Sequence, residues 1–203
     1  MNDLTSDLTP LFPRQQVPAL MVWLAGGGVF ELATEPSTTF TLIVFYRGRH
    51  CPVCRSYLRS LEEHLDQFSQ RGVGVVAIST DTLERAEGAK ADWNLPRLRI
   101  GYGLTLSDAR RWGLFVSTSR GKTSLGIEEP ALFPEPGLFL VRPDGTLFFS
   151  SVQSMPFARP RFDDILGAVD YVLKNDYPPR GEVVDLEEVA ASRTSTAPMD
   201  ALT

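Results

Sequence analysis

The 203-residue sequence lacks several features, and each absence excludes a class of protein. It has only two cysteines, so it is not a small scaffold held together by several disulfide bonds. Its formal net charge of -5 leaves no basic excess to neutralise phosphates, so we expect no nucleic-acid partner. The longest apolar runs, such as 42–45 and 137–141, are far shorter than the ~20 residues that cross a bilayer, so we expect no membrane partner.

The N-terminal residues also lack the pattern of a secretory signal. Asp3 and Asp7 stand where such a signal carries positive charge followed by an apolar stretch. A chain with two cysteines fits a reducing compartment, and we therefore expect a cytoplasmic protein. Its 43% hydrophobic and 22% charged residues exclude a mainly disordered or coiled-coil chain.

The apolar periodicity predicts one α/β domain. Residues 40–46 and 73–79 are almost continuously apolar, as strands covered on both faces are, and each precedes a helical pattern. Residues 117–136 show no periodicity and predict a surface excursion. The expected parts are a lead-in over 1–14, the domain over 15–179 and a tail over 180–203. Within the domain we expect a hairpin over 17–32, helices over 52–71, 80–93, 104–112 and 160–174, a strand over 98–102 and a hairpin over 137–149.

The two cysteines form a C-x-x-C motif, Cys51-Pro52-Val53-Cys54, between a predicted strand and a predicted helix. A helix N-terminus has unpaired amide groups and the positive end of the helix dipole, which favour a thiolate over a thiol. The second thiol lies one helical turn further on, where it can attack the oxidised first thiol. The motif therefore predicts a reversible two-electron dithiol–disulfide cycle.

Basic residues surround this motif. Arg47, Arg49, Arg55 and Arg59 flank it, and no Asp or Glu occurs between positions 35 and 62. Cysteines at helix termini or beside cations have pKa values of roughly 3.5–7.5 instead of ~8.5. His50 is either an ordinary loop residue or an electrostatic aid to the thiolate.

The two cysteines allow two other interpretations. They could be small buried side chains without chemistry, although such residues need neither the proline nor the basic flank. They could also hold a metal ion with His50 and His64, but zinc sites usually pair C-x-x-C with a second ligand pair, and His50 is badly placed to share an ion with Cys51. We therefore predict no metal and no cofactor besides the redox-active disulfide.

Four motifs, taken together, resemble the peroxiredoxin-like (AhpC/TSA-type) branch of the thioredoxin superfamily. They are FYRGRHCPVC at 45–54, VVAISTD at 75–81, PGLFLVRPDG at 136–145 and MPFARP at 155–160, and the resemblance covers about residues 15–175. It implies a thioredoxin-like fold, with a central mixed sheet flanked by helices and a redox pair at the start of the first main helix. The N-terminal hairpin would be an extension of that fold.

The resemblance also implies roles for three residues outside the motif. Pro136 would be the cis-proline that packs against the redox cysteines; the alternative is an ordinary loop proline. Arg159 matches a family arginine near the site; the alternative is a surface arginine that caps the last helix. Relatives often pair, so a homodimer is compatible with the resemblance.

The sequence departs from the usual peroxiredoxin motif P-x-x-x-T-x-x-C. Arg47 stands near the place of the proline, Cys51 at the threonine and Cys54 at the peroxidatic cysteine. An arginine that many relatives carry before the G-L-F strand is replaced by Pro136. Losing these hydrogen-bond donors weakens the case for fast peroxide reduction. The alignment makes Cys54 the attacking residue. The position of Cys51 at the helix end instead favours Cys51 as the attacking residue and Cys54 as the resolving residue.

The sequence thus predicts a thiol-dependent oxidoreductase that reduces peroxides or disulfides through a reversible Cys51–Cys54 disulfide. An external reductant of the thioredoxin, glutaredoxin or glutathione type would reopen the disulfide. The alternative is a redox-sensing or binding module of the same fold with little turnover, which would hold a partner with residues 117–136 and the tail.

Overall fold

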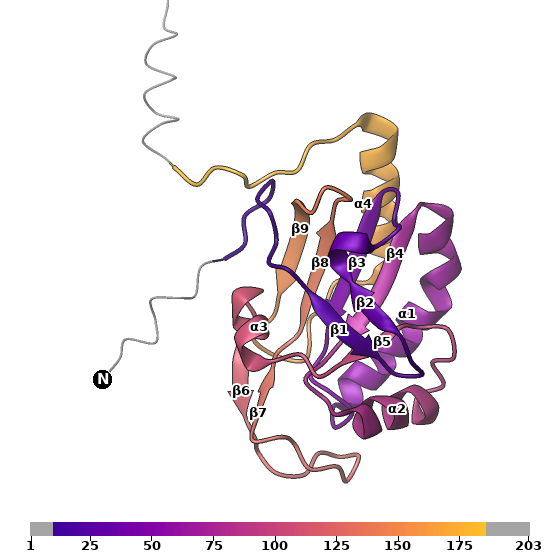
Figure 1. Cartoon of the computed structure of the whole chain (residues 1–203), viewed down its shortest axis with the longest axis vertical. Coiled ribbons are helices and arrows are strands. Elements are labelled where there is room, and N and C mark those ends of the chain that lie inside the picture. Colours follow the sequence, from indigo (N-terminus) through magenta and orange to yellow (C-terminus); the bar gives the residue numbers. More distant parts are fainter. Residues whose placement is uncertain (1–9, 186–203) are drawn as a thin grey trace, which may run out of the picture.

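The computed structural model of the chain describes residues 10–185, which form a seven-stranded mixed sheet with helices on both faces (Figure 1). The elements in chain order are β1 (Met21–Leu24), β2 (Val29–Glu31), a 3-10 turn (Leu32–Thr34), β3 (Phe40–Phe45), α1 (Pro52–Gln70), β4 (Val73–Ile78), α2 (Leu83–Asp92), β5 (Ile100–Tyr102), α3 (Leu106–Arg111), β6 (Val116–Thr118), β7 (Leu132–Pro134), β8 (Gly137–Val141), β9 (Leu147–Val152) and α4 (Phe162–Asn175).

The strands of the sheet lie in the order β2-β1-β5-β4-β3-β8-β9. The central strand β3 pairs in parallel with β4 and antiparallel with β8, and all six of its residues are buried. A strand with neighbours on both sides and helices over both faces needs mostly apolar side chains, as its sequence FTLIVF provides. Its one polar side chain, Thr41, donates a hydrogen bond to the Ser37 hydroxyl at 3.2 Å. The predicted central mixed sheet is therefore confirmed.

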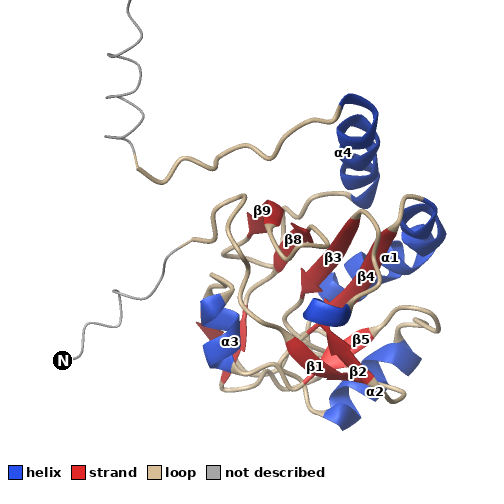
Figure 2. Ribbon diagram, turned by 45° about the horizontal axis from the view of Figure 1, so that its top comes forward, coloured by secondary structure: helices blue, strands red, loops and turns tan. Residues whose placement is uncertain are grey.

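Alternate residues of β3 pack into two separate hydrophobic cores. Leu42 and Val44 belong to the core beneath α1, α2 and α4, whereas Ile43 and Phe45 belong to the core beneath α3. In the second core the rings of Phe45 and Trp112 are 5.4 Å apart. Figures 1 and 2 show α1 and α4 on one side of the sheet and α3 on the other. The carboxyl end of β3 leads directly into the C-x-x-C motif, so the central strand anchors the motif.

The predicted helices and hairpins are confirmed within a few residues, but residues 117–136 differ from the expectation. Instead of an irregular excursion they contain two short strands, β6 and β7, paired antiparallel. Each strand has only three residues, which is too short to show periodicity in the sequence. We call residues 116–134 the β6–β7 hairpin.

The predicted lead-in and tail lie only partly within the described residues: positions 1–9 and 186–203 fall outside them. Residues 180–185 form neither helix nor strand. They run back from α4 toward the N-terminal segment (Figure 1), where Glu182 lies 3.7 Å from Arg14.

Among the helices of the described residues, none combines the length and the apolarity needed to span a membrane.

Candidate active site

The dithiol motif forms the first turn of α1. Cys51 is the N-cap residue, in an extended backbone conformation, and its sulfur accepts a hydrogen bond from the Cys54 amide at 3.2 Å. Pro52 occupies the first helical position, where its missing N–H is not needed and its fixed φ suits a helix. The Cys51 sulfur therefore takes the place of the Ser or Thr oxygen that usually caps a helix.

The loop between β3 and α1 is fastened to the loop that follows β4. The Arg49 amide donates to the Asp81 carboxylate at 2.7 Å, and the Cys51 amide donates to the Gly48 carbonyl at 3.1 Å. Gly48 has a φ of +128°, and a Cβ at this position would lie 2.8 Å from Asp81 Oδ1. Glycine is thus required for the turn that delivers Cys51 to the helix start.

The two thiols are free, fully buried and electrostatically unequal. The hydrogen bond from the Cys54 thiol, the Cys54 amide and the charges of Arg159 and Arg47 outweigh burial and lower the pKa of Cys51 to about 6. Burial, followed by the hydrogen bond to Cys51 and the charge of Cys51, raises the pKa of Cys54 well above its usual value. The surroundings therefore favour ionisation of Cys51 before Cys54.

Arg159 reaches the dithiol from the loop between β9 and α4. Its Nη2 donates to the Cys54 sulfur at 3.1 Å, and its Nε donates to the Pro156 carbonyl at 2.8 Å. The guanidinium also lies over the ring of Tyr57, 4.9 Å from the ring centre. Tyr57 in turn donates to the Pro160 carbonyl at 2.8 Å, which ties this loop to α1. The structure thus places Arg159 beside the dithiol and not at the surface.

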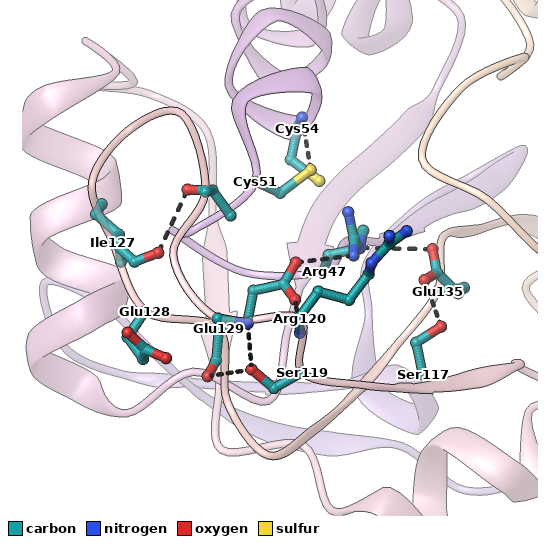
Figure 3. Close-up of polar contacts among 12 residues, drawn as sticks. Arg47, Cys51, Cys54, Ser117, Ser119, Arg120, Ile127, Glu128, Glu129 and Glu135 are labelled. Atoms are coloured by element: carbon teal, nitrogen blue, oxygen red, sulfur yellow. Dashed lines mark hydrogen bonds and ion pairs between the residues drawn. The ribbon is translucent and has the colours of Figure 1, made fainter.

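Arg47 lies on the other side of the motif and is almost completely enclosed. Its Nη2 is 3.1 Å from Glu129, its Nε is 3.5 Å from Glu135, and its guanidinium lies 4.5 Å from the ring centre of Phe133. All three partners belong to the β6–β7 hairpin or the residue after it. In Figure 3 dashed lines join the Arg47 guanidinium to the carboxylates of Glu129 and Glu135. Arg47 thereby joins the motif loop to the hairpin.

Further hydrogen bonds hold these carboxylates in place. The second oxygen of Glu129 accepts from the Arg120 amide at 2.7 Å, and Ser117 donates to Glu135 at 2.6 Å (Figure 3). Neither Glu129 nor Glu135 was predicted from the sequence as a site residue. One signal was present: Glu135 is the only charged residue in the otherwise apolar and proline-containing run from 131 to 141. A lone charge in such a run indicates a buried ion pair.

His50 lies beneath the hairpin, fully buried, with its ring 4.8 Å from that of Phe133. Neither ring nitrogen has a hydrogen-bond partner among the described residues. Burial and then the charge of Arg47 lower the pKa of His50 to about 4. A neutral ring supplies no positive charge to the thiolate, which favours the interpretation of His50 as a loop residue.

Two other predicted site residues have different surroundings from those expected. The side chain of Arg49 turns toward α2, where it contacts Asp92 at 2.6 Å and lies against Gly88. Pro136 is buried between β7 and β8, but the described residues contain no cis peptide bond, so the prediction of a cis-proline is wrong. Its carbonyl accepts a hydrogen bond from the Gln153 amide at 2.9 Å.

Residues 10–185 contain no group of three or more His, Cys, Asp or Glu side chains that could hold a metal ion. His64, the second histidine considered as a ligand, contacts the Ser60 carbonyl and Asp163 on α1 and α4.

Comparison with known proteins identifies the family and the fold. The model of the AhpC/TSA family matches residues 13–150. No curated protein matches the sequence. Among solved structures, the peroxidoxin BcpB from Mycobacterium tuberculosis is 16% identical with a TM-score of 0.63, over 80% of this chain and 98% of its own. The reduced 2-Cys peroxiredoxin of Plasmodium vivax is 17% identical with a TM-score of 0.66, over 82% and 84%.

A mutant of the Peroxiredoxin 6 of Arenicola marina is 19% identical with a TM-score of 0.64, over 89% of this chain and 88% of its own. At such identities the similarity concerns the fold. It confirms the predicted thioredoxin-like α/β architecture.

Proposed function

The chain belongs to the AhpC/TSA family of thiol-dependent oxidoreductases, and from this premise we propose that Cys51 and Cys54 reduce peroxides through a reversible disulfide. The observation that carries this assignment of residues is the unequal pair of thiols. Cys51 caps the helix and its sulfur accepts from the Cys54 amide at 3.2 Å, which helps to lower its pKa, whereas burial raises the pKa of Cys54. An ionised nucleophile beside a protonated thiol is what the first step of such a cycle needs.

In the first step the Cys51 thiolate attacks one peroxide oxygen. An S–O bond forms, the O–O bond breaks, and the sulfur becomes a sulfenic acid while the peroxide is reduced to an alcohol or water. The leaving oxygen takes up a proton, which the Cys54 thiol holds next to Cys51. The departure of this proton leaves Cys54 as the thiolate that the second step requires.

In the second step Cys54 attacks the sulfenic sulfur of Cys51. The S–S bond forms, the S–O bond breaks, and hydroxide leaves and is protonated to water. Once Cys51 is oxidised it no longer carries the charge that raises the pKa of Cys54. The guanidinium of Arg159, 3.1 Å from the Cys54 sulfur, then stabilises the attacking thiolate.

Burial of the site favours a small oxidant. Both cysteines have 0% exposed surface, and the β6–β7 hairpin is anchored beside them through Arg47. A hydroperoxide needs access only for two oxygen atoms, whereas a protein disulfide must bring two bulky side chains to the attacking sulfur. We therefore assign peroxide rather than disulfide as the oxidising substrate.

The proposed cycle needs no bound cofactor, because the two sulfurs themselves carry both electrons. An external thiol of the thioredoxin, glutaredoxin or glutathione type would reduce the disulfide, and such a reductant fits a cytoplasmic location. The homodimer stays a prediction, which light scattering of the purified protein measures.

One experiment tests the assignment. Reduced protein is mixed with hydrogen peroxide or with a small neutral disulfide, and the Cys51–Cys54 disulfide is followed by acid quenching, alkylation and mass spectrometry. We expect peroxide to close the disulfide much faster than it oxidises free cysteine, and faster than the small disulfide does. A peroxide rate equal to that of free cysteine would contradict the proposal and favour a sensing or binding module.

A further inference from the structure

Ion pairs join α1 to α4 at two points. Arg71, directly after α1, contacts both oxygens of Asp170 at 2.6 and 2.7 Å. Nearer the dithiol, His64 Nε2 lies 3.0 Å from Oδ1 of Asp163, in the first turn of α4. Arginine keeps its charge throughout the neutral pH range, whereas histidine loses its charge there. The helices are therefore joined by one permanent ion pair and by one that depends on pH.

The contacts of His64 are those of a charged ring. Its Nδ1 lies 2.6 Å from the carbonyl oxygen of Ser60, and its Nε2 faces the carboxylate of Asp163. Both partners accept hydrogen bonds, so both ring nitrogens must donate, which only the imidazolium form can do. The hydrogen bond to Ser60, followed by the contacts with Asp163, outweighs burial and raises the pKa of His64.

The charged groups around this ring come from three segments. Asp163 reaches it from α4, and Glu63 precedes it on α1; both carboxylates favour its charged form. Arg161, in the loop before α4, contacts the second oxygen of Asp163 at 3.2 Å. The side chain of Arg161 is 77% exposed, whereas that of His64 is 14% exposed. Water therefore screens the pair of Arg161 more strongly than the pair of His64.

Asp163 belongs to a segment that packs against α1. Residues 156–163, which we call the 156–163 segment, run from the loop after β9 into the first turn of α4. Within it, the ring of Phe162 lies 4.4 Å from that of Tyr57 and 6.1 Å from that of His64. Tyr57 and His64 stand two helical turns apart on α1 and so contact the same short segment.

The same segment places Arg159 at the dithiol. The guanidinium lies over the Tyr57 ring and donates to the Cys54 sulfur. Ala158, the residue before Arg159, has a φ of +54°, a left-handed conformation that a residue with a Cβ keeps only where its surroundings hold it. Contacts that fix the 156–163 segment on α1 therefore also fix the direction of the Arg159 side chain.

We propose that the charged His64 is a positioning residue for the proposed reaction: it holds Asp163, and with it the 156–163 segment, so that Arg159 stays on the Cys54 sulfur. The inference rests on the proposed function, because it concerns the step in which Cys54 closes the disulfide.

The direction of the pH effect follows from the charge of the ring. The ion pair with Asp163 is fully present below the ordinary histidine pKa of about 6.5, and it is lost as the pH rises through the higher pKa of the folded His64. The neutral ring also loses one of its two donors. A smaller share of the protein then holds Arg159 on the Cys54 sulfur.

The test compares disulfide closure in the wild type and in H64Q across a pH series. Reduced full-length protein is mixed with hydrogen peroxide, and the conversion of the Cys51 sulfenic acid into the disulfide is followed by rapid quenching and mass spectrometry. Ionisation of the cysteines affects both proteins alike, so the ratio of their closure rates reports the charge of His64. We expect the wild type to close about threefold faster near pH ~6, and the ratio to fall to about one above the pKa of His64.

Two further variants separate positioning from helix docking in general. D170N breaks the ion pair of Arg71 between the same helices, so any effect on closure should be the same at every pH. H64R keeps a cation opposite Asp163 at every pH, so above the pKa of His64 it should close about threefold faster than the wild type. Urea unfolding checks that each variant is folded.

The chain has only two histidines, so NMR can follow His64 directly. Its ring signals should titrate above about 6.5 in the wild type, with a lower midpoint in D163N. The signals of His50 should stay those of a neutral ring, because burial lowers its pKa to about 4.

A closure ratio that does not change with pH would overturn the proposal, and so would a midpoint of the ratio that differs from the NMR midpoint of His64. An H64R variant that loses closure at high pH as the wild type does would count against it equally. If peroxide closes no disulfide in the wild type at any pH, the proposed function itself fails and this inference fails with it.

Discussion

The guanidinium of Arg159 donates a hydrogen bond to the sulfur of Cys54 across 105 residues of sequence, with Nη2 and Sγ 3.1 Å apart. Arg159 is held in this place by the Pro156 carbonyl and by the face of the Tyr57 ring. The contact is made to the protonated member of the pair and not to Cys51. This arrangement suits a positioning role in the second step, when Cys54 must ionise.

We therefore expect R159Q to slow disulfide closure more than the attack on peroxide. Glutamine keeps a hydrogen-bond donor but removes the charge that stabilises the Cys54 thiolate. Closure should slow about tenfold, while the first step should slow less, because Arg159 makes a smaller contribution to the pKa of Cys51. Rapid quenching with a sulfenic-acid trap measures both rates. R161Q, at an exposed neighbouring arginine, is the control; equal effects of the two substitutions would contradict this role.

The ionisation of Cys51 predicts the pH dependence of the first step. Because its pKa is about 6, the thiolate fraction, and with it the rate of alkylation, should rise with pH through about 6 and level off by neutral pH. Below that value Cys51 is protonated and unreactive. Alkylation of Cys51 by iodoacetamide, followed by mass spectrometry across a pH series, measures this midpoint.

Substitution of Cys54 tests the largest cause of that low pKa. C54A removes the thiol that donates to Cys51, so the midpoint should move upward, toward the value of an ordinary cysteine. C54S keeps a hydroxyl donor and should shift the midpoint less. If C54A and C54S titrate alike, the thiol donor is not what holds the Cys51 pKa low.

The variants C51S and C54S should form different oxidised products with peroxide. C51S should leave peroxide reduction at the background rate, because the buried, protonated Cys54 is a poor nucleophile. C54S should still form a sulfenic acid at Cys51, which then persists and is oxidised further to the sulfinic acid under excess peroxide. Mass spectrometry distinguishes one added oxygen from two. A sulfenic acid at Cys54 in C51S would reverse the assigned roles.

The sequence was sufficient to predict the sheet, the main helices and the dithiol, because these depend on local patterns. The apolar strand at 40–45, the proline at the first position of α1 and the cysteine before it specify their own structure. Arg159 was placed near the site by resemblance to a family, and the structure puts it there.

The surroundings of the dithiol were less predictable, because they depend on contacts between distant segments. The ion pair of Arg47 with Glu129 joins residues 82 positions apart, and no local sequence pattern predicts it. Arg49 looked equivalent to Arg47 in the sequence, yet its side chain lies on α2. The expected cis bond at Pro136 was carried over from the family, whereas here the peptide is trans.

The buried ion pairs of Arg47 lead to a prediction about stability. R47Q would leave the carboxylates of Glu129 and Glu135 buried without a cation, and breaking such a pair costs about 3–5 kcal/mol. Urea unfolding of R47Q and of R111Q measures the difference. R111Q breaks an exposed pair with Asp108 and should cost below about 1 kcal/mol.

The ion pairs of Arg47 with the two carboxylates also lead to a prediction about the access of reagents to the thiols. E129Q removes one of the two carboxylates that hold Arg47 but leaves Glu135 in place, so the fold should persist while the β6–β7 hairpin loosens. A bulky maleimide should then label Cys51 several-fold faster than in the wild type, because it needs the hairpin to move aside. Reaction with hydrogen peroxide should change little, since a small oxidant does not need the larger opening. If maleimide labelling is unchanged in E129Q and in R47Q, the hairpin does not control access to the dithiol, and its contacts with Arg47 serve stability alone.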